Sequence, residues 1–225
     1  MTQLLAALAL FVALHSVPAL PAVRARLIAR LGRGPYLALY SLASLLSLAW
    51  VFHAALAMDT VLLWGTAPWQ GHLALVAAPL GLFLVIAGLI SPNPASITLR
   101  PGARPGAIVA VSRHPVLWGF LAWALGHLAP NGDLGSLVLF GGLALFSAAG
   151  LAVLDRRARR RLGSDWPGFA AATSVLPFAA ALGGRTRLSL DRPLLLAAAL
   201  TALATWALLA GGHAALFGAD PRVFL

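Results

Sequence analysis

Long apolar stretches alternate with short polar ones along the whole 225-residue sequence. A transmembrane helix needs about 20 mostly apolar residues to cross a hydrocarbon core of about 30 Å. Six apolar stretches are candidates, and five of them reach or approach this length. The fourth in chain order is shorter, and it needs either an earlier start or a thinned bilayer to span. The pattern predicts an all-α bundle of about six spanning helices, at residues 4–20, 36–57, 72–90, 116–128, 134–154 and 194–217.

Arginines gather in every second connection between the predicted helices. Four lie between the first and second helices, three lie between the third and fourth, and eight lie between the fifth and sixth. In the two remaining connections the only charged residues are Asp59 and Asp133. Because basic residues mark the cytoplasmic side of a membrane, the alternation predicts a multi-pass protein of a bacterial inner membrane with both termini periplasmic.

Two polar segments complete the predicted organisation. Residues 155–192 are too polar at both ends to span, yet contain apolar and aromatic residues, which predicts an interfacial segment on the cytoplasmic surface. Residues 91–113 hold four prolines, which predicts an irregular connection on the same side. Since no repeat or linker divides the chain, we expect residues 1–225 to form a single transmembrane domain.

Composition supports lipid as the main partner. Hydrophobic residues make up 60% of the chain and charged residues only 10%, whereas soluble domains carry about 25% charge. The absence of cysteine excludes disulfides and thiolate metal sites. The net charge of +10 could suggest nucleic acid, but the arginines flank apolar segments, so we expect no nucleic-acid partner. No basic residue precedes the first apolar stretch, which favours a first helix over a signal peptide.

Histidine is the only plentiful chemically active side chain within the predicted spans. His15 lies in the first span, and His127 lies late in the fourth, one turn after Trp123 on the same face. Polar rings at membrane depth favour a functional role, although interhelical hydrogen bonding would also explain them. Two imidazoles without thiolates suit haem iron, copper or zinc, and facing helices commonly supply both axial ligands of a haem.

The other histidines have different predicted positions. His114 precedes Pro115, a residue suited to the first turn of a helix, and should lie at the cytoplasmic mouth of the fourth span. It is 13 residues from His127, about 20 Å along a straight helix, so the two cannot bind one metal. His53, His72 and His213 fall near the ends of spans and favour membrane-surface positions.

Three motifs resemble the NnrU family of bacterial membrane proteins, which is related to the plant ζ-carotene isomerases. They are Ala13-Leu14-His15-Ser16, Ser112-Arg113-His114-Pro115, and Trp123-Ala124-Leu125-Gly126-His127-Leu128 followed by Asn131-Gly132-Asp133. The resemblance implies a haem b protein with His15 and His127 as axial ligands. Trp123, His114 and Arg113 would then lie beside or gate the site.

The same resemblance implies a redox-linked role. It would be either a haem-dependent isomerisation of a hydrophobic polyene or a function in nitric oxide handling and denitrification. The substrate would accordingly be a hydrophobic small molecule or nitric oxide.

Two other functions stay open on the sequence. The segment from Arg113 to Gly119 is similar to the Arg-His-Pro-x-Tyr-x-Gly motif of membrane methyltransferases that use S-adenosylmethionine. However, Leu117 replaces the tyrosine, and the chain contains no glutamate to match their paired glutamates. The third hypothesis is a non-enzymatic accessory protein in which the histidines only stabilise the bundle.

Overall fold

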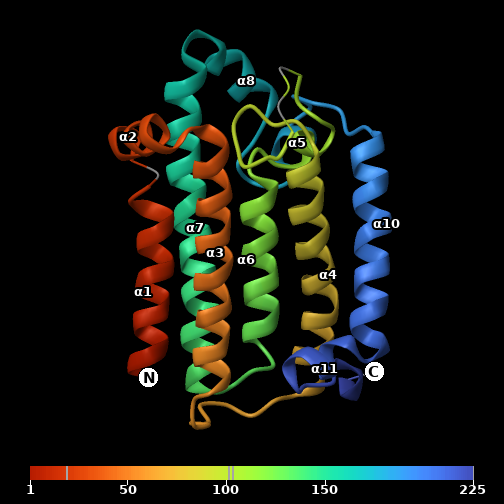
Figure 1. Ribbon diagram of the computed structural model, residues 1–225. Coiled ribbons are helices and arrows are strands. Elements are labelled where there is room, and N and C mark those ends of the chain that lie inside the picture. The colour runs from red at the N-terminus through yellow and green to blue at the C-terminus, as the bar shows by residue number, and fades with distance from the viewer. Residues whose placement is uncertain (19, 101, 103, 225) are drawn as a thin grey trace. The chain divides into compact units, whose positions relative to one another are not determined.

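The computed structural model describes residues 1–18, 20–100, 102 and 104–224 (Figure 1). Within these residues the regular structure is helical, apart from one isolated bridge between Leu62 and Asp133. The predicted all-α class is therefore confirmed. The described chain divides into two compact units, Met1–Gly65 with Asn131–Gly142 and Thr66–Pro130 with Leu143–Leu225. The single domain stays a prediction.

The first unit contains three helices and the beginning of a fourth. The helices are α1 (Thr2–Ser16), α2 (Pro21–Leu31), α3 (Arg33–Leu56) and the first part of α7 (Leu134–Leu162). Helices α1 and α3 pack against each other. The predicted first span, residues 4–20, is shorter as a helix because α1 ends at Ser16, and the arginine-rich stretch after it forms the separate helix α2.

The second unit contains the remaining elements, which include the later part of α7. In chain order they are α4 (Pro68–Ile90), α5 (Ile108–Val111), α6 (Pro115–Leu128), η1 (Gly163–Asp165), α8 (Trp166–Ala172), α9 (Ala179–Leu182), α10 (Arg192–Ala207), η2 (Leu208–Gly212), α11 (His213–Phe217) and η3 (Pro221–Phe224). Proline stands in the first turn of α4, α6 and α10, where its missing N–H leaves no carbonyl unpaired. Local sequence therefore fixes where these helices begin.

Four helical segments among the described residues are long and apolar enough to cross a membrane: Arg33–Leu56, Pro68–Ile90, Leu134–Ala172 and Arg192–Phe217. The broken pair α1 and α2 is a fifth candidate, whereas α6, with 14 residues, is shorter. These helices identify an integral membrane protein. The helix that contains the fifth predicted span is longer than that span, because α7 continues past residue 154 to Leu162 and takes up part of the expected interfacial segment.

Helices α4 and α6 of the second unit pack closely against each other. A Cβ added at Gly119 would lie 2.5 Å from the carbonyl oxygen of Gly81, and one added at Gly81 would lie 2.5 Å from that of Gly119. Gly88 and Gly126 lie seven residues further along each helix. A Cβ added at either of them would lie 2.6 Å from a side chain of the other helix. Small residues allow helix backbones to approach closely within a membrane, and here they hold both ends of α6 against α4.

Candidate functional site

A partly buried ion pair joins Arg113, two residues before α6, to Asp155 of α7. Arg113 is 6% exposed, and its Nη1 donates to Asp155 Oδ1 of α7 over 2.5 Å. Its Nε donates to the Thr173 hydroxyl over 3.0 Å, and its Nη2 donates to the Thr173 carbonyl over 3.2 Å. The guanidinium also lies 4.8 Å from the centre of the Trp166 ring. Arg113 thus joins α6, α7 and the segment after α8, and we call Arg113, His114, Asp155 and Thr173 the polar lock.

His114 contacts the same carboxylate oxygen as Arg113. It is fully buried, and its Nε2 lies 3.2 Å from Asp155 Oδ1. Burial lowers the pKa of His114 below its ordinary value of 6.5, and this outweighs the opposing effect of the hydrogen bond to Asp155. The ring is therefore neutral near pH 7, with Nε2–H donating to the carboxylate.

Hydrogen bonds to two backbone carbonyl groups connect the polar lock and its neighbours to the segment that follows α8. The Arg113 N–H donates to the Ser174 carbonyl over 2.7 Å. The Ser112 hydroxyl and the Trp118 indole N–H both donate to the Val175 carbonyl, over 2.9 and 2.8 Å. The predicted irregular connection therefore carries an ordered polar cluster, and Arg113 and His114 belong to it.

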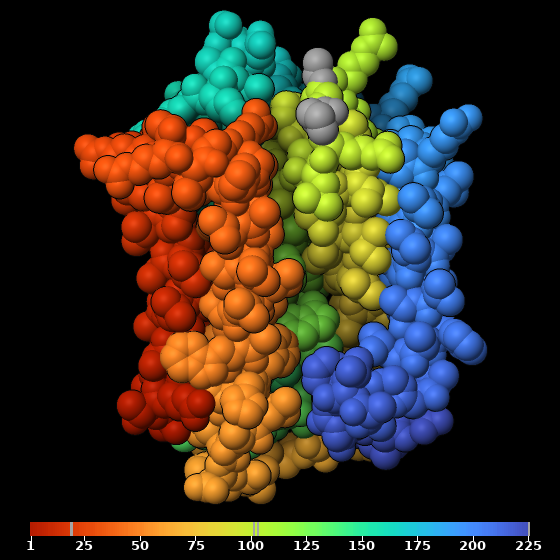
Figure 2. Space-filling model, in the orientation of Figure 1, coloured from red at the N-terminus to blue at the C-terminus, as the bar shows by residue number. Residues whose placement is uncertain are grey.

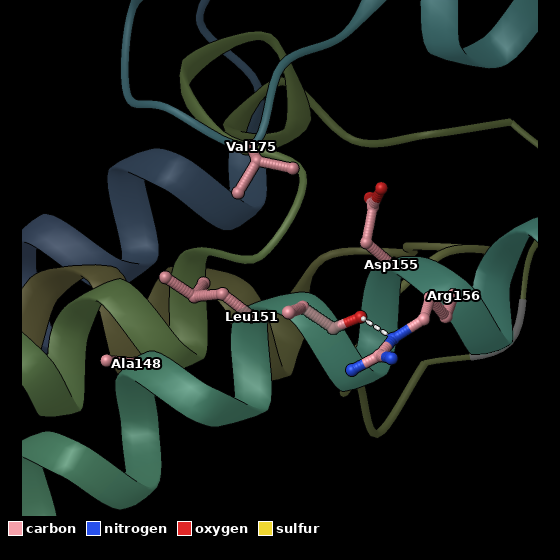
Figure 3. Close-up of a pocket in the computed structure, with 6 residues that line it drawn as sticks. Ala148, Leu151, Asp155, Arg156 and Val175 are labelled. Atoms are coloured by element: carbon pink, nitrogen blue, oxygen red, sulfur yellow. Dashed lines mark hydrogen bonds between the residues drawn. The ribbon is translucent and has the colours of Figure 1, made fainter.

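An open pocket of about 550 Å³ lies beside the polar lock (Figure 3). Its apolar wall consists of Ala148, Leu151, Ala152 and Val175, and its charged residues are Asp155 and Arg156. The Asp155 carboxyl group points away from Arg156, whose Nε donates to the Ala152 carbonyl over 3.2 Å. The pocket therefore combines a hydrocarbon-like wall with a carboxylate that already binds Arg113.

The second predicted site centres on His127 at the far end of α6. Its Nδ1 lies 2.9 Å from the Trp123 carbonyl oxygen, and the two rings are 4.6 Å apart between centres, as expected for residues that share a face. His213 of α11 lies against it, with ring centres 6.4 Å apart and planes inclined by 20°. His114 and His127 thus lie at opposite ends of α6.

His15 lies in the last turn of α1, in the other compact unit. Its Nδ1 is 2.7 Å from the Phe11 carbonyl oxygen, and its Nε2 is 2.8 Å from the Ser44 hydroxyl. The Phe11 ring centre is 4.1 Å away. Because His15 and His127 belong to different units, their predicted shared site stays a prediction.

The hydrogen bonds of His15 and His127 determine which ring nitrogen carries the proton. A carbonyl oxygen can only accept, so Nδ1 must carry the proton in each neutral ring and Nε2 must carry the lone pair. Metal-binding histidines are usually held in this way, with the other ring nitrogen donating to a carbonyl or carboxylate. Both residues therefore fit a ligand role, although the Ser44 hydroxyl would have to turn away from His15. The described residues contain no cluster of three or more histidine, cysteine or acidic ligands.

Sequence reasoning missed two residues of the polar lock. Asp155 and Thr173 lie 42 and 60 residues after Arg113. The available signal for Asp155 was its place as the first charged residue after a long apolar stretch. His53 and His72 are exposed near helix ends, as expected.

These features define a helical integral membrane protein with a buried arginine–aspartate pair and histidines within its apolar helices. The sequence model of the NnrU protein family matches residues 3–221, nearly the whole chain, and the protein belongs to this family. It is also similar to the 15-cis-zeta-carotene isomerase, chloroplastic, of Arabidopsis thaliana, with 34% identity over 84 residues. That alignment covers 37% of this chain and only 23% of the plant protein. No solved structure matches the chain.

Proposed function

We propose that this protein binds haem b within the membrane and isomerises a double bond of a hydrophobic polyene. The observation that carries the cofactor proposal is the common arrangement of His15 and His127, whose Nδ1 atoms both face the carbonyl oxygen one turn earlier. In this arrangement Nδ1 carries the proton and Nε2 carries the lone pair, as in metal-binding histidines. When bound, haem would supply an iron whose coordination depends on its redox state.

His127 is the better supported ligand of the proposed cofactor. Trp123 lies against its ring and offers a flat apolar surface beside the metal position. His15 is the second ligand that the family resemblance implies. The polar lock would position the beginning of α6, and with it the helix that carries His127, without contacting the cofactor.

The substrate class follows from the relative and from the apolar exterior. The similar plant protein is described as an isomerase of a cis polyene, and isomerisation needs no second substrate. Helices with many exposed leucines, such as α3 and α10, are in contact with lipid, which dissolves such substrates. We further propose a bacterial inner membrane with both termini periplasmic, as the arginine alternation predicts. Nitric oxide handling and methyl transfer stay predictions, because no described contact favours either.

The test is isomerisation by haem-loaded protein in lipid vesicles containing 15-cis-ζ-carotene, followed by chromatography of the extracted polyenes. Under reducing conditions, wild-type protein should raise the rate of loss of the 15-cis isomer well above that of empty vesicles. His127→Ala should abolish this increase, whereas the exposed control His72→Ala should retain it. Haem-loaded wild-type protein that leaves the isomer ratio unchanged would overturn the isomerase proposal. Under that outcome the accessory-protein hypothesis would be favoured.

A further inference from the structure

We infer that the open pocket beside the polar lock binds an anionic phospholipid, whose acyl chain lies on the apolar wall and whose phosphate is held by Arg156. The residues that line this pocket all belong to the second unit. None of them is a proposed haem ligand, so this inference does not depend on the proposed function.

The apolar wall of the pocket follows one face of α7. Ala148, Leu151 and Ala152 are spaced three and four residues apart, which places them on the same side of that helix. Val175 reaches the pocket from the segment after α8 (Figure 3). The volume of about 550 Å³ lies within the range of about 300–1,000 Å³ that small-molecule sites occupy. Because α7 belongs to a helical segment that is long and apolar enough to cross a membrane, the hydrocarbon that reaches this wall is a lipid chain.

Arg156 marks the point where this face of α7 becomes charged. Its side chain is exposed, and its Nε donates to the Ala152 carbonyl oxygen over 3.2 Å, whereas its Nη1 and Nη2 donate to no other described residue. Asp155 does not neutralise it, because that carboxyl group points away from Arg156 and accepts from Arg113 and His114. The two remaining amino groups therefore suit a phosphate, which a guanidinium binds through two parallel hydrogen bonds.

The surroundings of Arg156 are strongly basic. Four more exposed arginines follow it before α7 ends, at Arg157, Arg159, Arg160 and Arg161. Arg159 and Arg160 lie about one helical turn after Arg156 on the same face, and their side chains donate to no other described residue. Figure 2 shows the blue-green stretch that contains the end of α7 at the surface of the molecule. Because basic residues beside a transmembrane helix attract anionic lipids, the charge favours an anionic headgroup over a zwitterionic one.

A phospholipid matches both parts of the pocket, whereas simpler ligands match only one. Inorganic phosphate would pair with Arg156 but would leave the apolar wall uncovered. A polyene without a charged group would cover the wall but would leave the guanidinium without an anion. A phospholipid covers the wall with hydrocarbon and supplies the phosphate oxygens that Arg156 needs.

The test measures lipid binding to the full-length protein in detergent by native mass spectrometry. Phosphatidylglycerol is the probe, and phosphatidylcholine with the same acyl chains is the zwitterionic comparison. The wild type should bind phosphatidylglycerol about tenfold more tightly, which is the effect of about one charge-assisted hydrogen bond. Arg156→Gln should remove most of this preference, and Arg156→Lys, which keeps the charge, should retain part of it. Ala148→Leu, which enlarges a side chain on the wall, should also weaken the binding of phosphatidylglycerol.

Two matched variants separate this pocket from the general attraction of a basic helix. Arg157→Gln removes the neighbouring arginine, and Ala149→Leu enlarges the neighbouring alanine. Both residues are exposed, and neither lines the pocket, so both variants should bind lipid like the wild type. Circular dichroism and the melting temperature without added lipid show that each variant is folded.

The inference is overturned if the wild type binds the two lipids equally, or if Arg157→Gln loses as much of the preference as Arg156→Gln. Displacement of phosphatidylglycerol by an equal concentration of inorganic phosphate would also overturn it, because the acyl chain would then contribute nothing. Displacement by 15-cis-ζ-carotene would assign the pocket to the polyene instead. None of these measurements needs haem, so this inference and the proposed function fail separately.

Discussion

The guanidinium of Arg113 donates to the carboxylate of Asp155 over 2.5 Å, and this pair joins the beginning of α6 to α7. The carboxylate also accepts from His114 through the same oxygen atom. Two separate stretches of the second unit, the beginning of α6 and α7, therefore meet at one acidic side chain.

Replacing Asp155 with asparagine should destabilise the protein. Breaking a buried ion pair costs about 3–5 kcal/mol, and because the Asp155 side chain is 28% exposed, we expect a loss of about 2 kcal/mol. The free energy of unfolding would be measured by denaturant titration in detergent micelles. Asp165→Asn, at an exposed position, is the matched control and should change little. Equal stability of Asp155→Asn and the wild type would contradict the structural role of the pair.

Stability should fall as the pH falls below about 6.5. The pKa of His114 is lowered in the folded protein by burial, so the unfolded chain binds more protons in this range. The contribution of the neutral ring is complete above pH 6.5, and it is lost as the pH falls towards the lowered pKa. Melting temperatures between pH 5 and pH 8 would measure this effect. In His114→Asn, which cannot titrate there, the slope should be shallower, and an unchanged slope would refute the assignment.

The crossing of α4 and α6 should not tolerate a side chain at Gly119. A Cβ there would lie 2.5 Å from the Gly81 carbonyl oxygen and 2.8 Å from the Val85 nitrogen. Overpacking of this kind costs about 1–3 kcal/mol, so Gly119→Ala should lower the melting temperature. Gly168→Ala is the control, since nothing lies within 4 Å of its added Cβ. If both variants melt like the wild type, the helices do not approach this closely.

Asp191 should stabilise the beginning of α10 through its two carboxylate oxygens. One oxygen accepts from the Leu194 N–H over 2.9 Å, and the other accepts from the Ala107 N–H over 2.8 Å. Loss of a helix cap costs about 0.5–2 kcal/mol, so Asp191→Ala should reduce the free energy of unfolding by about 1–2 kcal/mol. Asp191→Asn keeps one oxygen acceptor and should lose less. If neither substitution lowers the free energy of unfolding in a denaturant titration, the capping role of Asp191 is wrong.

The positions of the helices could largely be predicted from hydrophobic stretches and prolines, because lipid-exposed backbone must form its hydrogen bonds within each helix. The end of α7 could not, because the arginines after residue 154 suggested the end of the span. Arginine is a good helix former, and the helix continues beyond its apolar part to Leu162.

The candidate site was only partly predictable for a different reason. Arg113, His114 and Trp123 were found because they fall in short motifs or at helical spacing. Asp155 and Thr173 join Arg113 across 42 and 60 residues, and such pairings arise from packing rather than from local pattern.

The central claim, that this membrane protein binds haem, is tested most directly by the absorption spectrum of the purified wild-type protein. Protein expressed with sufficient haem supply and extracted in mild detergent should show a Soret band and about one haem per chain, in keeping with two imidazole ligands for one iron. Colourless protein, together with a haem-free preparation that takes up no added haem, would contradict the account.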